Sequence, residues 1–317
     1  MGAFFFAYLN YNFTMKLSVS THWNAHRHNN GYSMVQEILE LGIQNIELGY
    51  NTHQHMINGV KEAMQKDGVQ VTSLHNFCPV PMGSQGHPET FLLGSLRKQE
   101  RQAAVYHITK TIEMAAELNA KAIVVHTARV KTPFVSTYDL IRLIELDKKQ
   151  TKKYEKTKAK LITRRENRVE KYMNVLLPAL ETLVPILEKH NVTMGLEILP
   201  TWDAIPSEYE IPKIIEHCKS EKIKGWYDIG HVQIRENLGL VNQEKILPKL
   251  SPHIAGFHIH DVIYPGLDHQ VPGTGKVDYQ IFKPYLKDKL LVLEPSTHFS
   301  DDQLKPGIDY IKKQWKI

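Results

Sequence analysis

The chain has 317 residues, of which 42% are hydrophobic and 23% charged, and its formal net charge is +5. These values are typical of a soluble globular protein with one large domain, and the mild positive charge is compatible with anionic substrates. The apolar run FFFAYL near the start has no basic segment before it and is too short to span a bilayer, so no membrane anchor is expected. The two cysteines, Cys78 and Cys218, lack metal-type spacing, which predicts a reduced, cytoplasmic environment.

Eight short apolar runs rich in β-branched residues predict β-strands, most of them starting about 25 to 35 residues apart. We expect these strands at 16–20, 43–47, 70–75, 121–126, 193–197, 224–228, 254–260 and 289–294. Apolar residues at three- and four-residue spacing predict helices between them, for example at 34–41, 56–66, 101–118 and 172–190. Repeated strand–helix units predict an α/β fold, a (β/α)8 TIM barrel. The barrel is expected to form a single domain over 15–317, with residues 1–14 as an N-terminal extension.

Two strand-to-strand connections are longer than the rest. A Gly- and Pro-rich segment, 79–88, follows the third expected strand, and a lysine-rich segment, 132–168, lies between the fourth and fifth. Long insertions of this kind often form lids or subunit contacts, and we expect a long helical insertion rather than a second domain. The basic stretch 148–171 is interpreted as a solvated helix face, with a nucleic-acid patch as the alternative.

Polar or charged residues stand at the ends of the expected strands. In chain order they are Ser20, Glu47, His75, His126, Glu197, Asp228, His258 with His260, and Glu294. Burying a bare charge costs several kcal/mol, so a charged group at the end of a buried strand needs a partner such as a metal ion. Active sites of TIM barrels lie at the carboxyl ends of the strands. The pattern therefore predicts a functional site at that end of the barrel.

The last four strands supply a set of groups suited to a metal ion. Glu197, Asp228, His258 and Glu294 are three carboxylates and one imidazole, each at or near the end of its strand. An oxygen-rich set with one nitrogen and no thiolate suits Mn²⁺, Mg²⁺, Co²⁺ or Zn²⁺. We expect one divalent metal ion here.

Eight short motifs follow one another along nearly the whole expected barrel. They are NIELG (45–49), SLH (73–75), VVHT (124–127), GLE (195–197), YDIGH (227–231), FHIHD (257–261), DHQVPGTG (268–275) and LEP (293–295). Their order and spacing resemble the xylose isomerase-like TIM barrels, which include sugar phosphate isomerases and epimerases, inositol-catabolism enzymes and endonuclease IV. The resemblance implies a metal-dependent sugar or sugar-phosphate isomerase or epimerase.

Carried over residue by residue, the resemblance implies that Glu197, Asp228, His258 and Glu294 bind the cation. In the ketose epimerase branch the two glutamates also act as acid and base on opposite faces of the substrate. A metal that chelates a carbonyl and a neighbouring hydroxyl acidifies the adjacent C–H bond, and a carboxylate can remove that proton. Five further residues are expected to contact substrate or orient the site: His75, His126, His231, His269 and Glu47. For Glu47 a structural salt bridge is the alternative, and His260 is expected to be a core or orienting histidine.

The resemblance leaves two alternatives open. The first is an endonuclease IV-like, zinc-dependent enzyme acting at abasic DNA, because histidines matching His75, His126 and His269 bind additional zinc ions in that branch. Leu267 stands where that branch has a carboxylate, and no asparagine follows Glu197, so nucleic acid is disfavoured without being excluded. A second metal ion stays open. The second alternative is a non-catalytic polyol-binding barrel, against which the retention of both glutamates argues.

Other properties are left undetermined by the sequence. The sugar and its phosphorylation state are not identified, and Arg129, Arg235 and Lys276 are all candidates for binding a phosphate. Relatives often form dimers or tetramers, so the resemblance is compatible with a homo-oligomer of unknown size.

Overall fold

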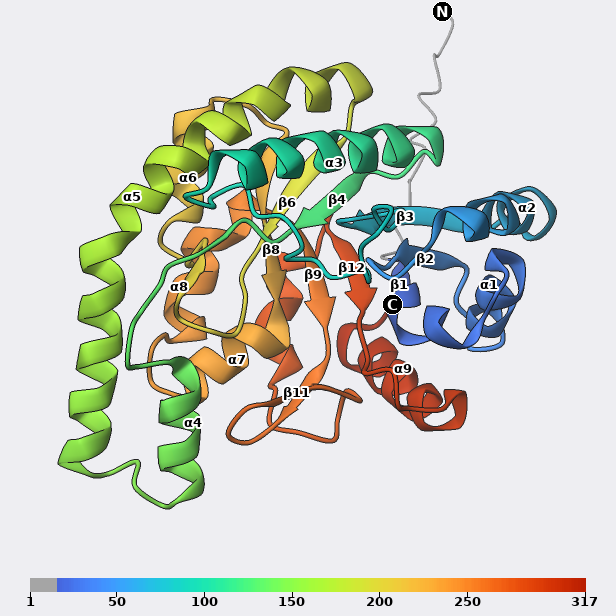
Figure 1. The fold of residues 1–317 in the computed structure, drawn as a ribbon. Coiled ribbons are helices and arrows are strands. Elements are labelled where there is room, and N and C mark those ends of the chain that lie inside the picture. Colours follow the sequence, from blue (N-terminus) through green and yellow to red (C-terminus); the bar gives the residue numbers. More distant parts are fainter. Residues whose placement is uncertain (1–15) are drawn as a thin grey trace, which may run out of the picture.

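A closed barrel of eight parallel strands forms the centre of the computed structural model, which describes residues 16–317 (Figure 1). Around the barrel the strands are β1 (Leu17–Ser20), β2 (Asn45–Leu48), β3 (Gln70–His75), β4 (Ala122–Val125), β6 (Thr193–Glu197), β8 (Ile223–Asp228), β9 (Ile254–Ile259) and β12 (Leu290–Leu293). The predicted barrel is confirmed, and apart from the start of β2 every strand boundary lies within one residue of its expected position. The expected N-terminal extension, 1–14, lies outside the described residues.

Helices surround the barrel (Figure 1). They are α1 (Gly31–Leu39), α2 (Ile57–Asp67), α3 (Lys98–Glu117), α4 (Thr137–Glu145), α5 (Lys152–His190), α6 (Ile211–Cys218), α7 (Ile229–Asn237), α8 (Gln243–Leu250) and α9 (Asp301–Trp315). Gly68 and Asn119 follow α2 and α3 in the left-handed conformation, with φ of 68° and 56°. This conformation ends a helix and turns the chain toward the next strand. No helix within 16–317 is long and apolar enough to cross a membrane.

Alternate residues of the strands point into the barrel, because side chains on a strand change face at every step. On five strands, two successive inward-facing residues form a pair. The first is apolar or a glycine, and the second, at the carboxyl end of the strand, is a histidine or a carboxylate. The pairs are Val124 with His126, Gly195 with Glu197, Trp226 with Asp228, Gly256 with His258, and Val292 with Glu294. The two-residue strand period therefore places the reactive side chains in one layer at the carboxyl ends of the strands. The layer beneath it consists of apolar side chains and glycines.

Trp226 fills the barrel beneath this layer. Its side chain is fully buried and packs with a small inner cluster that includes Val124 and Val292. A Cβ added to Gly195 would lie 2.8 Å from the Trp226 ring, and one added to Gly256 would lie 2.6 Å from it. The two glycines therefore make the room that the indole occupies. The indole ring lies 5.2 Å from that of His258, between ring centres, so it supports the floor of the site.

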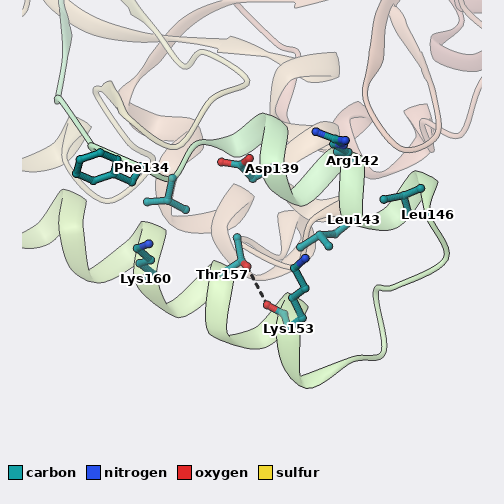
Figure 2. A pocket seen from close by; sticks show the side chains of 9 residues that line it. Phe134, Asp139, Arg142, Leu143, Leu146, Lys153, Thr157 and Lys160 are labelled. Atoms are coloured by element: carbon teal, nitrogen blue, oxygen red, sulfur yellow. Dashed lines mark hydrogen bonds between the residues drawn. The ribbon is translucent and has the colours of Figure 1, made fainter.

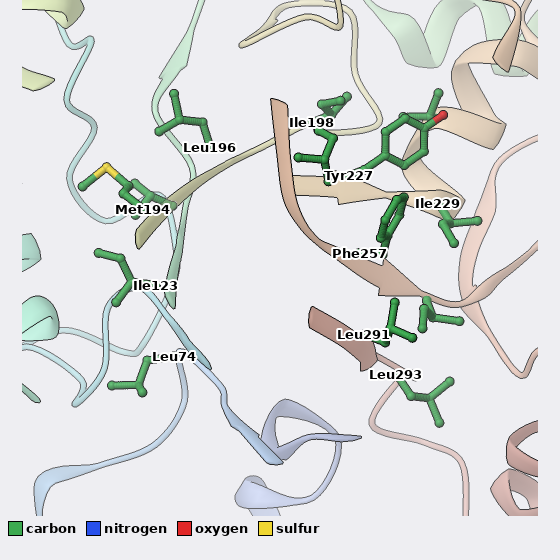
Figure 3. Packing of buried hydrophobic residues seen from close by; sticks show 14 of the residues in the cluster. Leu74, Ile123, Met194, Leu196, Ile198, Tyr227, Ile229, Phe257, Leu291 and Leu293 are labelled. Atoms are coloured by element: carbon green, nitrogen blue, oxygen red, sulfur yellow. The ribbon is translucent and has the colours of Figure 1, made fainter. Parts of the chain in front are cut away.

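The residues between the inward pairs form the outer wall of the barrel. Figure 3 shows this packing, with side chains such as Leu196 on β6, Tyr227 on β8 and Phe257 on β9. They belong to one continuous core with helix residues such as Ile112 of α3 and Leu183 of α5. The wall holds the strands in place, so the inward layer is presented from a rigid frame.

The expected insertion between the fourth and fifth barrel strands is helical. In Figure 1, α4 and the first half of α5 extend along one side of the barrel. The lysine-rich segment and the helix expected at 172–190 form one continuous helix of 39 residues. Arg165 anchors it, because its buried guanidinium makes two 2.8 Å hydrogen bonds to the carboxylate of Glu210. The insertion is therefore fixed to the barrel by a buried ion pair.

Two small antiparallel sheets lie beyond the carboxyl ends of the barrel strands. One pairs β5 (Ala128–Arg129) with β7 (Ala204–Ile205), and the other pairs β10 (Asp261–Ile263) with β11 (Leu267–Gln270). None of these four short strands is among the eight strands expected from the sequence. These sheets place Arg129 and His269 at the rim of the barrel.

Candidate active site

The four predicted metal-binding residues converge at the carboxyl end of the barrel. One ligand atom from each of Glu197, Asp228, His258 and Glu294 lies within 4.8 Å of the others, and all four side chains are buried. Nδ1 of His258 is 3.3 Å from Oε1 of Glu197 and 3.2 Å from Oε2 of Glu294. Residues that are far apart in the chain thus form one compact, oxygen-rich group.

Asp228 leaves one oxygen free toward this group. It caps the start of α7, where its Oδ1 accepts a 2.7 Å hydrogen bond from the backbone N–H of His231. The same Oδ1 lies 2.8 Å from Nε2 of His260. Oδ2 is buried and makes no hydrogen bond, and Nδ1 of His231 and Nδ1 of His258 lie 3.2 Å and 3.7 Å from it. A buried acceptor without a partner is costly, so the group fits a divalent cation both by this free oxygen and by its donor set.

Four histidines surround Glu197, and the most distant is His231, whose Nδ1 lies 3.5 Å from Oε1. Nε2 of His126 and Nε2 of His75 lie 2.8 Å and 3.1 Å from its Oε2, and Nδ1 of His258 contacts the other oxygen. Burial alone would raise the pKa of Glu197, but His126, His231 and His258 hold it well below its usual value. Glu197 is therefore ionised and held in one orientation.

Glu294 has the opposite electrostatic environment. Burial and the neighbouring carboxylates of Glu197 and Glu47 outweigh the attraction of His258 and raise the pKa of Glu294 to about 8. A cation bound among these groups would favour the ionised form of Glu294.

Glu47 lies beneath the site. Its fully buried carboxylate is 3.1 Å from Nε2 of His258 and accepts a 2.8 Å hydrogen bond from the hydroxyl of Ser73. It is absent from the lining of the cavity described below. This position corresponds to the salt-bridge alternative, in which Glu47 orients the His258 ring, rather than to contact with a substrate.

A cavity of about 280 Å³ opens above the metal-binding group. Of the four predicted ligands, Glu197 and Glu294 line it, whereas Asp228 and His258 do not. The remaining lining residues are Tyr50, His75, His87, Pro88, Glu89, His126, Arg129, Leu199, Pro200, His231 and His269. Four of the five residues expected to contact substrate are thus in its wall. The volume lies just below the usual range of small-molecule sites, about 300–1,000 Å³.

Several lining residues were missed by the sequence reasoning. Tyr50 follows β2, and His87 and Glu89 lie on the long segment after β3. Glu89 contacts Nδ1 of His126 at 3.3 Å and Nε of Arg129 at 2.8 Å. A loop residue such as Glu89 belongs to no periodic sequence pattern. The unusual length of its loop was the one feature of the sequence that could have indicated a role at the site.

A separate cavity of about 370 Å³ lies between α4 and α5 (Figure 2). Its lining includes Phe134, Arg142, Lys153 and Lys160, and the Thr157 hydroxyl donates a hydrogen bond to the backbone of Lys153. None of the predicted metal-binding residues lines this cavity. The predicted metal-binding residues therefore lie at the barrel mouth and not at this cavity.

Comparison with known proteins identifies the family. The chain matches the family model described as xylose isomerase-like TIM barrel over residues 35–314. It belongs to this family. It is 28% identical to an uncharacterized protein of Methanocaldococcus jannaschii over 304 residues, which cover 94% of this chain and 99% of the relative.

Solved structures share the fold of this xylose isomerase-like barrel. A 3-keto-D-glucoside 4-epimerase from E. coli superposes with a TM-score of 0.68 at 16% identity, covering 95% of this chain and all of the other. An L-ribulose 3-epimerase gives a TM-score of 0.68 at 14% identity, with 96% and 95% covered. A D-psicose 3-epimerase from Clostridium cellulolyticum H10, solved with D-tagatose, gives 0.67 at 12% identity, with 95% and 99% covered. At such low sequence identities, the similarity to these structures shows a shared fold and nothing more.

Proposed function

We propose that this protein is a metal-dependent sugar or sugar-phosphate isomerase or epimerase. One observation carries the proposal: the ligand atoms of Glu197, Asp228, His258 and Glu294 lie within 4.8 Å of one another, and the two glutamates also line the cavity. Binding a metal alone would not require carboxylates exposed to a substrate. The solved structures of similar fold that are named sugar epimerases support this choice.

Each group has a role in the proposed reaction. Glu197, Asp228, His258 and Glu294 hold one divalent ion, Mn²⁺, Mg²⁺, Co²⁺ or Zn²⁺, which when bound acidifies the C–H bond next to a chelated carbonyl. One of the two glutamates removes that proton, and the other delivers a proton to the same or the opposite face. Asp228 and His258, away from the cavity, serve only as ligands.

Histidines in the cavity wall position the substrate. His75 and His126 hold Glu197 through its Oε2, and with His231 and His269 they offer ring nitrogens to sugar hydroxyls. A substrate held in this way has its reacting carbon between the two glutamates. Positioning of this kind is a major part of catalysis because it avoids the entropy cost of bringing the groups together.

We test the proposal with Mn²⁺-loaded protein and a panel of ketoses and ketose phosphates in heavy water. Conversion of one sugar with uptake of deuterium at the reacting carbon is expected, and Glu197→Gln or Glu294→Gln should abolish it. Conversion without deuterium uptake would indicate a hydride shift and contradict proton transfer by the glutamates. A loaded protein that converts no member of the panel contradicts the proposed function.

A second candidate function rests on two further clusters. His75, His126 and Glu197 form one, and His231, His260 and His269 form the other, each with ligand atoms within 4.8 Å. Clustered metal ions of this kind would suit the endonuclease IV-like alternative. Cleavage of an abasic-site duplex by zinc-loaded protein, lost in Glu197→Gln, would favour it over sugar chemistry.

We also propose a cytoplasmic location. Within the described part of the chain both cysteines are free, Cys78 buried and Cys218 half-buried. Free thiols persist in reducing compartments. Alkylation of Cys218 in intact cells, without prior reduction, would test this.

A further inference from the structure

The insertion formed by α4 and the first half of α5 holds most of the positive charge of the protein. Segment 148–171 contains eleven lysines and arginines but three glutamates, a net charge of +8, whereas the whole chain carries +5. The rest of the chain is therefore net negative. In this stretch of the described chain, the ion pairs are those of Lys158 with Glu155 and of Arg165 with two glutamates. The other nine cations of the segment have no carboxylate partner there, unlike the lysines of a helix face balanced by glutamates one turn away.

Three cations line the cavity between α4 and α5. Arg142 comes from α4, and Lys153 and Lys160 come from α5. None of the three forms an ion pair with another residue of 16–317. Among the described residues of the lining, Asp139 is the only carboxylate, and its Oδ2 accepts hydrogen bonds of 2.7 Å and 3.0 Å from the backbone and hydroxyl of Ser136. Like charges that share a cavity repel one another, so an anion bound among them is stabilised.

The α5 wall of this cavity continues beyond it as a stripe of positive charge. Lys153, Lys160 and Arg164 recur at seven- and four-residue spacing, which places them on one face of the helix. At 1.5 Å per residue the stripe is about 16 Å long. Nη1 of Arg164 is buried without a hydrogen-bond partner among the described residues. The stripe is longer than one small anion and therefore suits a chain of anionic groups.

An exposed aromatic ring lies beside the stripe. Phe134 is 91% exposed, and its ring centre lies 5.7 Å from the guanidinium of Arg164. Figure 2 shows Phe134 and Lys160 at the same end of the cavity. Nucleic acid bases stack on aromatic rings and on arginine, and their phosphates pair with lysine and arginine. A ring next to a row of unpaired cations therefore matches a phosphate chain whose bases are accessible.

We propose that the cavity between α4 and α5 binds single-stranded nucleic acid, with phosphates along its cations and a base stacked on Phe134. This function is separate from the sugar chemistry proposed for the barrel mouth and does not depend on it. A duplex keeps its bases paired and stacked inside, so it offers Phe134 no ring. A membrane surface is flat and meets the rim of a cavity, not cations in its two walls. An acidic protein segment supplies carboxylates but no row of flat rings.

Fluorescence anisotropy with the full chain tests the proposal. The probes are fluorescein-labelled oligo(dT) and oligo(U) of about 16 nucleotides, titrated at several salt concentrations. We expect binding of at least one of them, and the tighter of the two shows whether the site prefers DNA or RNA. Four cations, those of Arg142, Lys153, Lys160 and Arg164, should give a slope of log K against log salt of about −3, at about −0.7 for each phosphate contact.

Two variants separate the charge from the ring. Lys153→Gln combined with Lys160→Gln should weaken binding about 10-fold or more at low salt and reduce the steepness of the salt dependence by about half. Phe134→Ala should weaken binding about 5-fold or more and leave the salt dependence unchanged. The matched control is Lys245→Gln combined with Lys249→Gln on α8. It removes two exposed lysines that form no ion pair within 16–317, and it should bind like the native protein.

Several results would overturn the proposal. They are the absence of binding by both oligonucleotides, a duplex of equal length that binds as tightly, and equal losses in the α5 and α8 double variants. Comparable binding of phosphatidylserine vesicles or of poly-glutamate, lost in the same α5 variant, would assign the cavity to a membrane or to an acidic protein instead. Glu197→Gln should bind the oligonucleotides like the native protein, and loss of binding there would place nucleic acid at the barrel mouth. Each of these failures leaves the proposed sugar chemistry intact, because that is measured separately by conversion of the ketose panel.

Discussion

The backbone N–H of His269 donates a 2.9 Å hydrogen bond to Nδ1 of His260. Nε2 of the same ring is 2.8 Å from Oδ1 of Asp228. The His260 ring thus lies against Oδ1 of Asp228, and Oδ2 of Asp228 lies on the side of His231 and His258. The proximity of His231, His260 and His269 does not by itself make them a site for another ion.

The contact between His260 and Asp228 predicts how many metal ions each chain holds. We expect one divalent ion per chain to remain after dialysis of protein loaded with excess Mn²⁺ or Zn²⁺, measured by plasma mass spectrometry. Asp228→Asn should reduce the content to background, because the free Oδ2 is replaced or reoriented. Retention of two or three ions by the native chain would contradict a single site and favour the nuclease alternative.

The same contact predicts how a substitution of His260 changes the affinity of the protein for Mn²⁺. His260→Gln removes the group that orients Asp228, and loss of such a partner lowers metal affinity about 10–100-fold. Titration calorimetry with Mn²⁺ measures the change. His253→Gln, a half-buried histidine at the opposite end of β9, is the matched control and should bind Mn²⁺ like the native protein. Equal affinity of the two variants would show that His260 does not act through Asp228.

The packing of Trp226 beneath the site predicts that substitutions at Gly195 and Trp226 affect stability in a coupled way. In Gly195→Ala the new methyl group would lie 2.8 Å from the Trp226 ring. Overpacking of this kind costs about 1–3 kcal/mol in the free energy of unfolding, measured by urea denaturation. Trp226→Phe removes Cε3, the nearest obstructing atom, and keeps Cβ at 3.1 Å, so Gly195→Ala should cost less in that background than in the native chain. Equal costs in both backgrounds would mean that the clash is not the cause.

The ion pair that anchors the insertion predicts a pH dependence. Although burial raises the pKa of Glu210, Arg165 and the N–H of Ser207 hold it below its usual value. A carboxylate whose pKa is lower in the folded state stabilises the fold above its unfolded pKa of about 4.3 and loses that contribution as the pH falls. Between about pH 5 and about pH 3 the free energy of unfolding should fall less steeply in Glu210→Gln than in the native protein.

The matched control for that experiment is an exposed ion pair. Glu221 pairs with Lys224 at the surface, with the glutamate side chain 89% exposed, so Glu221→Gln should keep the native slope. At neutral pH, Glu210→Gln leaves Arg165 buried without its partner and should cost about 3 kcal/mol or more. Identical slopes for both variants would exclude the Arg165 pair as a source of the acid sensitivity.

Much of the barrel and its metal-binding group could be predicted from strand ends alone. Val124 with His126 and Trp226 with Asp228 both follow the two-residue strand period. This period places His126 and Asp228 at the carboxyl end of the barrel. The rim was predicted less well, because its residues lie in connections without periodicity. Glu89 was missed, and the position of Glu47 beneath His258 corresponds to the alternative role considered for it.

The sequence by itself determined the fold and the identity of the groups at the barrel mouth, because apolar period and strand-end chemistry are local properties. Only the tertiary structure decided how those groups are paired. It directed Oδ2 of Asp228 toward His231 and His258, placed His260 against Oδ1 of Asp228, and surrounded Arg129 with Glu89 and Asp203. Such pairings depend on distances between side chains from different connections, and no spacing along one chain encodes those distances.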